Sequence, residues 1–181
     1  KFLVPELVAG VQLPFSPDLD ACELLLAIGV NTVVSHGHGV MRPNPLGHLR
    51  DVRSRGGRLV VVDPRRSETA HHADLHVAPR PGTDPAWLAF LVRHVMRSGA
   101  DRAFLDACAA PAGIGRLRTL VEPYDRDRAA VICNVTPESL DELARLVTEA
   151  GRVAIETGTG VSMGRSANLT EWPGWALSAV T

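Results

Sequence analysis

The sequence predicts an α/β protein, a Rossmann-like three-layer αβα sandwich around a mainly parallel sheet. The first observation is a set of short runs rich in Leu, Ile and Val, whose near-continuous hydrophobicity is typical of strands buried on both faces. The second is a set of amphipathic helical patterns between and after those runs, as crossovers between parallel strands require. The expected strands span residues 24–28, 59–62, 75–77 and 153–155.

The helical patterns are assigned in chain order. A helix over 45–55, with Leu and Val residues on one face, connects the first two strands and completes a βαβ unit. The next helix follows the third strand. It begins with Asp84 as its cap and Pro85 in its first turn, and it ends at Gly99.

The last strand is preceded by further helices. Residues 101–128 suggest two short helices joined by a Pro/Gly link at 111–115. A longer helix then begins with Thr136 as its cap and Pro137 at its first position, and it runs to Glu149. Helical segments thereby lie between the first and second strands and between the third and fourth, which suits a doubly wound α/β fold.

Composition limits the classes of partner. The 181 residues are 45% hydrophobic and carry a net charge of −1, so no electrostatic field is available to attract nucleic acid. No apolar run approaches the roughly 18 residues of a membrane span, so membrane insertion is not expected. Cys22, Cys108 and Cys133 are too few and too far apart for a disulfide framework. A reducing compartment, the cytoplasm, is the expected location.

The chain is expected to form one principal domain over residues 1–151. Residues 152–181 form either the start of an adjoining α/β domain or the last strand and helix of the same unit. Lys1 opens an apolar stretch without an initiator Met, and we expect both ends to be cuts through a longer polypeptide.

Chemistry is expected in the loops that follow the strands. In an open α/β sheet these loops converge where helix N-termini point their N–H groups at a ligand. Aspartates there can accept hydrogen bonds from a ribose or a base edge, an arginine can bind a phosphate, and glycines let the backbone approach a ligand. The candidate residues are Gly29 and Asn31 after the first strand, Asp63, Pro64 and Arg65 after the second, Gly82, Thr83 and Asp84 after the third, and Gly158 and Gly160 after the fourth.

Three other interpretations concern turns and helix caps, an NAD-binding loop and a zinc site. Any one of these loops is also explained by a tight turn or a helix cap, and only their convergence at one edge indicates a nucleotide. The glycines from Gly158 to Gly164 depart from the NAD fingerprint, because three residues separate the second and third. The histidine pairs His36 with His38 and His71 with His72 lack the spacing of a zinc site, and no metal ligand is expected.

Taken in order, the loops resemble the molybdopterin oxidoreductase superfamily, which includes formate dehydrogenases, nitrate reductases and dimethyl sulfoxide reductase. The most specific stretch runs from Leu59 to Asp84, with an Asp-Pro-Arg loop, a Glu-Thr-Ala turn, an Ala-Asp pair and an Arg-Pro-Gly-Thr-Asp loop in register. Upstream, Gly29 and Asn31 match a Gly-Ser-Asn-Pro element in which Val30 replaces Ser and Thr32 replaces Pro. The resemblance covers nearly the whole chain.

The resemblance implies a cofactor, bis(molybdopterin guanine dinucleotide) carrying molybdenum or tungsten, with one dinucleotide held by this domain. By position, the candidate residues after the first three strands would contact its guanosine and pyrophosphate, and Gly158 and Gly160 would lie at the crossing into the neighbouring domain. The intact enzyme would carry out two-electron redox on a small substrate. The remaining domains of the same polypeptide would be the partners of this one.

The sequence also departs from the family. The cysteine cluster for a 4Fe-4S centre, the residue that ligates the metal and the carboxy-terminal cap domain have no counterpart in these 181 residues, so we expect the chain alone to be inactive. One alternative is a structural homologue in a respiratory complex with an empty pterin site. Another is the central domain of a thiamine-dependent enzyme, which would not explain the register from Asp63 to Asp84.

Overall fold

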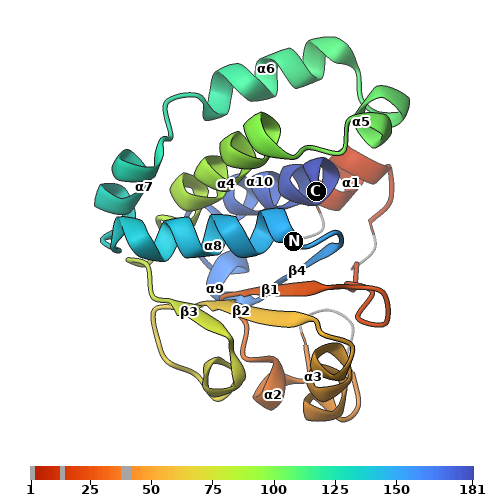
Figure 1. The fold of residues 1–181 in the computed structure, drawn as a ribbon, viewed down its shortest axis with the longest axis vertical. Helices are drawn as coiled ribbons and strands as arrows, with labels where there is room; N and C mark the ends of the chain where they lie inside the picture. The colour runs from red at the N-terminus through yellow and green to blue at the C-terminus, as the bar shows by residue number, and fades with distance from the viewer. Residues whose placement is uncertain (1–2, 13–14, 38–41) are drawn as a thin grey trace.

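A four-stranded parallel sheet forms the centre of the protein. The computed structural model describes residues 3–12, 15–37 and 42–181, so His38 lies outside the described residues. The sheet is formed by β1 (Leu24–Ile28), β2 (Arg58–Val62), β3 (Leu75–Val77) and β4 (Val153–Thr157), in the order β3-β2-β1-β4 (Figure 1). The predicted α/β class and the parallel sheet are confirmed.

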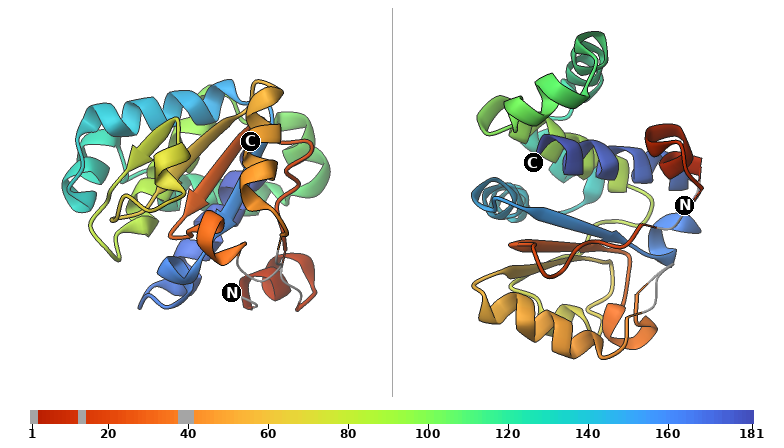
Figure 2. Two further views of the ribbon diagram at one scale, coloured as in Figure 1. Left: turned by 90° about the horizontal axis from the view of Figure 1, so that it is seen from below. Right: turned by 90° about the vertical axis from the view of Figure 1, so that its right-hand side faces the viewer.

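Helices cover both faces of the sheet (Figures 1 and 2). One face carries α2 (Thr32–Ser35), α3 (Pro45–Ser54) and the short 3-10 helix η1 (Ala70–His72), and the other carries α4 (Asp84–Ser98), α8 (Pro137–Glu149) and α10 (Ala167–Val180). Alternate residues of β1 divide between two cores. Leu24 and Leu26 pack with the α4 and α8 side, whereas Leu25 packs with the α3 side. Burial on both faces explains why the strand sequences are apolar throughout.

One predicted helix start is found and another is corrected. Thr136 caps α8 by accepting a hydrogen bond from the backbone N–H of Ser139 at 3.2 Å, with Pro137 in the first turn. In α4, however, the N-cap is Thr83, and Asp84 is the first helical residue. The Asp84 carboxylate instead accepts a hydrogen bond from the indole N–H of Trp87, and this leaves the prediction of Asp84 as the cap wrong.

The segment between α4 and α8 holds three helices, where two were predicted. They are α5 (Arg102–Cys108), α6 (Pro111–Val121) and α7 (Arg126–Cys133). The expected link over 111–115 is the first part of α6, because proline is tolerated at the first helical position and glycine lowers but does not abolish helix formation.

The remaining helices are α1 (Leu3–Ala9) and α9 (Thr159–Ser162). β4 pairs along its whole length with β1, and α10 packs against α4, so residues 153–180 share the sheet and helical layer of the rest. Within the described ranges, no helix has both the length and the hydropathy to cross a membrane.

Candidate functional site

The loops after the four strands leave the sheet at one rim. The sheet ladder extends one step past each strand. The Gly29 N–H donates to Val62 O at 2.9 Å, the Asp63 N–H donates to Val77 O at 3.0 Å, and the Gly158 N–H donates to Ile28 O at 2.9 Å. The first residues of these loops are therefore held at the same level, at the carboxyl ends of parallel strands. The order of the sheet also places a topological switch between β1 and β4, where such folds bind ligands.

Asn31 is the residue that ties two of these loops together. It occupies the N-cap position of α2, yet its side chain makes no capping hydrogen bond. Its Oδ1 instead accepts hydrogen bonds from the backbone N–H (3.2 Å) and Oγ1 (2.9 Å) of Thr69, and its Nδ2 donates to Glu68 Oε2 at 2.6 Å. The Asn31 amide thus links the loop after β2 to the loop after β1, and the Val33 N–H adds a hydrogen bond to Thr69 Oγ1 at 3.0 Å.

Asp63 and Arg65 form the turn after β2. Asp63 Oδ1 accepts from the backbone N–H of Arg65 at 2.8 Å, and its carbonyl oxygen is hydrogen-bonded to His76 Nε2 at 2.8 Å. Arg65 reaches Glu68 Oε2 at 3.3 Å, but both side chains are more than half exposed, so this pair adds little stability. Pro64 is exposed at the tip of the turn. A backbone N–H at Glu68, and then the Asn31 amide, lower the pKa of the Glu68 carboxyl.

Asp84 is a partly buried carboxyl at the start of α4. Burial raises the pKa of Asp84, and the negative charge of Asp63 raises it further. Hydrogen bonds from the Trp87 indole N–H, at 3.2 Å, and from a backbone N–H lower it in part. The negative charge of Asp63 therefore acts on the Asp84 carboxyl across the rim. Gly82 has a positive φ of 82°, and a Cβ there would meet nothing within 4 Å, so the loop before α4 is open to solvent on that side.

The glycines at the switch point contact one another. The Gly160 N–H donates to Gly29 O at 3.0 Å, and a Cβ on Gly158 would lie 2.3 Å from that same oxygen. Only glycine permits the loops after β1 and β4 to approach this closely. The sequence assigned these glycines to a ligand or to a crossing between domains, whereas here their visible role is contact between two loops of one sheet.

The structure brings the candidate residues of the first three loops to one rim. Hydrogen bonds link Asn31 to Glu68, Glu68 to Arg65 and Arg65 to Asp63. The charge of Asp63 also raises the pKa of Asp84. Gly158 and Gly160 lie at the β4 end of this rim, against Gly29. Among the described residues there is no cluster of His, Cys, Asp or Glu that could hold a metal ion.

Sequence reasoning missed a buried ion pair beside the switch point. Glu156, 5% exposed at the end of β4, pairs with Arg42 at 3.2 Å and accepts a hydrogen bond from Thr32 Oγ1 at 2.9 Å. Thr32 stands where the resembling family has proline, so the substitution itself was the available signal. The partners lie 114 and 124 residues apart from Glu156, a separation that no local pattern reveals.

Comparison with known proteins gives consistent relatives. Formate dehydrogenase H of Escherichia coli is 28% identical over 146 residues, which cover 80% of this chain and 19% of that protein. The periplasmic nitrate reductase of Desulfovibrio desulfuricans is 30% identical over 141 residues, which cover 74% of this chain and 18% of that protein. This chain therefore spans about a fifth of the length of the curated relatives it matches. No protein-family model matches it.

Among solved structures, acetylene hydratase from Pelobacter acetylenicus superimposes with a TM-score of 0.82. The superposition covers 98% of this chain and 23% of that one, at 21% sequence identity. At this level of identity the likeness concerns the fold, and it extends to the whole arrangement of sheet and helices described above.

Proposed function

This chain belongs to the molybdopterin oxidoreductase superfamily, and from that premise we propose that its rim binds one molybdopterin guanine dinucleotide. The observation that carries the proposal is the gathering of Asn31, Asp63 and Asp84 at the carboxyl ends of adjacent parallel strands and the start of α4. Two carboxyl groups at one rim suit the N–H groups of a guanine edge or the hydroxyls of a ribose.

The residues present fit the nucleotide end of this cofactor. Asp63 Oδ2 accepts no hydrogen bond from the part of the chain that the structure describes, so it is available to a ligand. Arg65 is 65% exposed beside it and can reach a phosphate if it leaves Glu68. Gly82 offers an open backbone at the start of α4, where helix N–H groups favour anions.

The proposed whole protein is an oxidoreductase that passes two electrons to or from a small substrate. A bound molybdenum or tungsten ion would supply that redox chemistry, and a 4Fe-4S cluster would be carried by another part of the polypeptide. The residues of this chain would orient the cofactor through its nucleotide, with the remaining domains of the same polypeptide as partners. The cytoplasm is the proposed location.

A titration with GDP tests the proposal. A dinucleotide is normally held between several domains, so this chain alone should bind GDP weakly. We expect a Kd of about 1 mM. The amide signals of the loops at 63–65 and 82–84 should shift, and Asp63→Asn should weaken binding several-fold. The control Asp106→Asn alters an exposed carboxylate on α5 and should leave the Kd unchanged. Shifts confined to other surfaces would contradict the proposal.

The alternative is a structural homologue whose pterin site is empty. One observation favours it: part of the rim is already paired within the chain, because Asn31 is bound to Thr69 and Glu68, and Arg65 is bound to Glu68. Under this alternative GDP leaves the amide spectrum unchanged, and a longer protein that contains this domain purifies without molybdenum or tungsten.

A further inference from the structure

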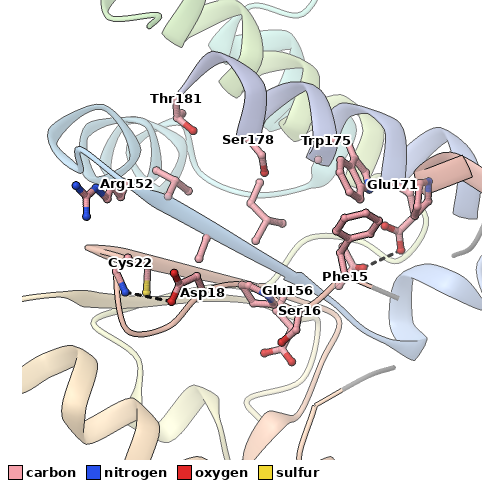
Figure 3. Close-up of a pocket in the computed structure, with 18 of the residues that line it drawn as sticks. Phe15, Ser16, Asp18, Cys22, Arg152, Glu156, Glu171, Trp175, Ser178 and Thr181 are labelled. Atoms are coloured by element: carbon pink, nitrogen blue, oxygen red, sulfur yellow. Dashed lines mark hydrogen bonds between the residues drawn. The ribbon is translucent and has the colours of Figure 1, made fainter. Parts of the chain in front are cut away.

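A buried ion pair lies behind the rim, at the end of β4. Arg42 Nη1 lies 3.2 Å from Glu156 Oε1, and the two side chains are 11% and 5% exposed. Arg42 Nη2 donates to Ser16 Oγ and, at 3.3 Å, to Pro17 O. Figure 3 shows Glu156 on β4 and Ser16 on the segment before β1, the two residues that Arg42 joins. Removing two charges from water costs about as much as their attraction returns, so stability alone does not explain this pair.

The ion pair holds both ends of α2, the single helical turn that follows Asn31. At the start of this turn, Thr32 Oγ1 donates to Glu156 Oε2 at 2.9 Å, and Thr32 is only 1% exposed. At its other end, the backbone N–H of Arg42 donates to the carbonyl oxygen of His36, the C-cap, at 2.7 Å. Helices shorter than about 12 residues are marginal in water, so a helix of four residues depends on such contacts for its position.

Asn31 connects the position of α2 to the loop after β2. Its backbone leads into α2 with a φ of −107° and a ψ of 71°, and its side chain makes no capping hydrogen bond to the helix. The amide instead accepts from the Thr69 N–H and donates to Glu68 Oε2. Glu68 and Thr69 belong to the loop that carries Asp63. A displacement of α2 would therefore displace the amide on which the placement of this loop depends.

We propose that Arg42 and Glu156 are positioning residues for the rim, which act through Thr32 and Asn31 on the loop that carries Asp63. Thr32 stands where the resembling family has proline. A proline at the first helical position fixes φ by its ring, whereas a threonine there is held through its hydroxyl and Glu156. The ion pair thus compensates for the missing ring. That this placement serves a ligand rests on the proposed function, but that it holds Asn31 does not.

Two substitutions of Thr32 separate positioning from the loss of one hydrogen bond. Thr32→Val and Thr32→Pro both remove the hydroxyl that binds Glu156, but only proline restricts the backbone. Hydrogen exchange at the Thr69 amide, which donates to Asn31 Oδ1, reports the link, and exchange at the Val61 amide in β2 reports global opening. Thr32→Val should speed exchange at Thr69 about fivefold more than at Val61. Thr32→Pro should change both rates by the same factor.

The ion pair itself is tested by the double variant Arg42→Met with Glu156→Leu, in which apolar side chains replace both charges and preserve most of the stability. Exchange at Thr69 should again be about fivefold faster relative to the β2 amide, and the Kd for GDP should rise by about fivefold. The matched control, Arg145→Met with Glu149→Leu, removes an exposed ion pair at the far end of α8 and should change neither quantity.

Adding Thr32→Pro to the double variant should restore both the exchange ratio and the Kd. Equal effects of valine and proline at position 32, or an unchanged exchange ratio in both Thr32→Val and the double variant, would overturn the proposal. Faster exchange at Thr69 with an unaltered Kd would overturn the role of the pair in binding. If the unaltered chain does not bind GDP, the proposed function fails, and the exchange rates still decide whether the ion pair holds Asn31.

Discussion

Among single residues, Asp84 gives the clearest link between folding stability and ligand binding. Burial raises the pKa of this carboxyl, with the nearby charge of Asp63 adding to the effect, so the folded chain holds its proton more tightly than the unfolded chain does. Such a group favours folding below its unfolded pKa and loses that contribution as pH rises through its folded pKa. At neutral pH the charged Asp84 is therefore a burden on stability, which is typical of residues kept for binding.

Replacing Asp84 by Asn should separate stability from binding. The amide keeps an acceptor for the Trp87 N–H but carries no charge, so we expect the Tm at pH 7 to rise by about 2–4 °C, the shift that about 1 kcal/mol produces in a domain of this size. The advantage should disappear as the pH falls below about 4, where unfolded aspartate becomes protonated. Thermal unfolding across this pH range measures it, and a lower Tm at pH 7 would refute the assignment. GDP binding should weaken in the same variant.

Asn31, unlike Asp84, stabilises the fold, because its hydrogen bonds link two loops. Asn31→Ala should destabilise the chain by about 1–3 kcal/mol, since it leaves the fully buried Thr69 without its acceptor. Urea unfolding measures the change, with Asn168→Ala on the exposed side of α10 as the control. A loss no larger than that of the control would mean that the two loops are held by other contacts.

At the scale of elements, the loops after β1 and β4 form one unit through their glycines. Gly158→Ala should cost about 3 kcal/mol or more, because the new Cβ would lie 2.3 Å from Gly29 O and 2.6 Å from Val30 Cβ, both in fixed positions. Gly115→Ala is the control. That glycine lies within α6 with nothing within 4 Å of an added methyl group, so alanine there should stabilise by about 0.5–1 kcal/mol. Comparable effects of the two substitutions would contradict the close approach.

The elements also show where local sequence signals suffice. The strands at 24–28 and 75–77 were predictable to the residue, because a buried parallel strand must be apolar at nearly every position. The start of α8 was equally clear from Thr136 and Pro137. The start of α6 was not, because Pro111 with two glycines soon after it suits a loop as well as a first helical turn, and packing beneath α6 decides between them.

At the scale of the whole molecule, contacts between distant segments decide what the sequence alone could not. The strand order and its rim follow from general rules of parallel sheets, so the gathering of Asn31, Asp63 and Asp84 could be predicted. The pairing of Arg42 with Glu156 could not, because the two residues lie 114 positions apart and neither stands out locally. The same applies to the buried Glu171, whose burial arises only when α10 covers the sheet.

The buried pair itself gives a prediction for global stability. Glu156→Leu should destabilise the chain by about 3–5 kcal/mol, because Arg42 would remain buried without its counterion. The double variant Arg42→Met with Glu156→Leu should recover most of that loss, since apolar side chains of similar size replace both charges. Chemical unfolding of the single and double variants measures the difference, and an equally unstable double variant would show that the pair does more than balance charge.

The central claim is that one rim, formed by the loops after β1, β2 and β3, binds a guanine nucleotide. Isotope-filtered nuclear Overhauser effects between GDP and the labelled chain test it most directly, because they report contact rather than affinity. The account predicts contacts from guanine and ribose protons to residues of the 63–65 and 82–84 loops. Contacts to the outer helices, with none at these loops while GDP is bound, would contradict it.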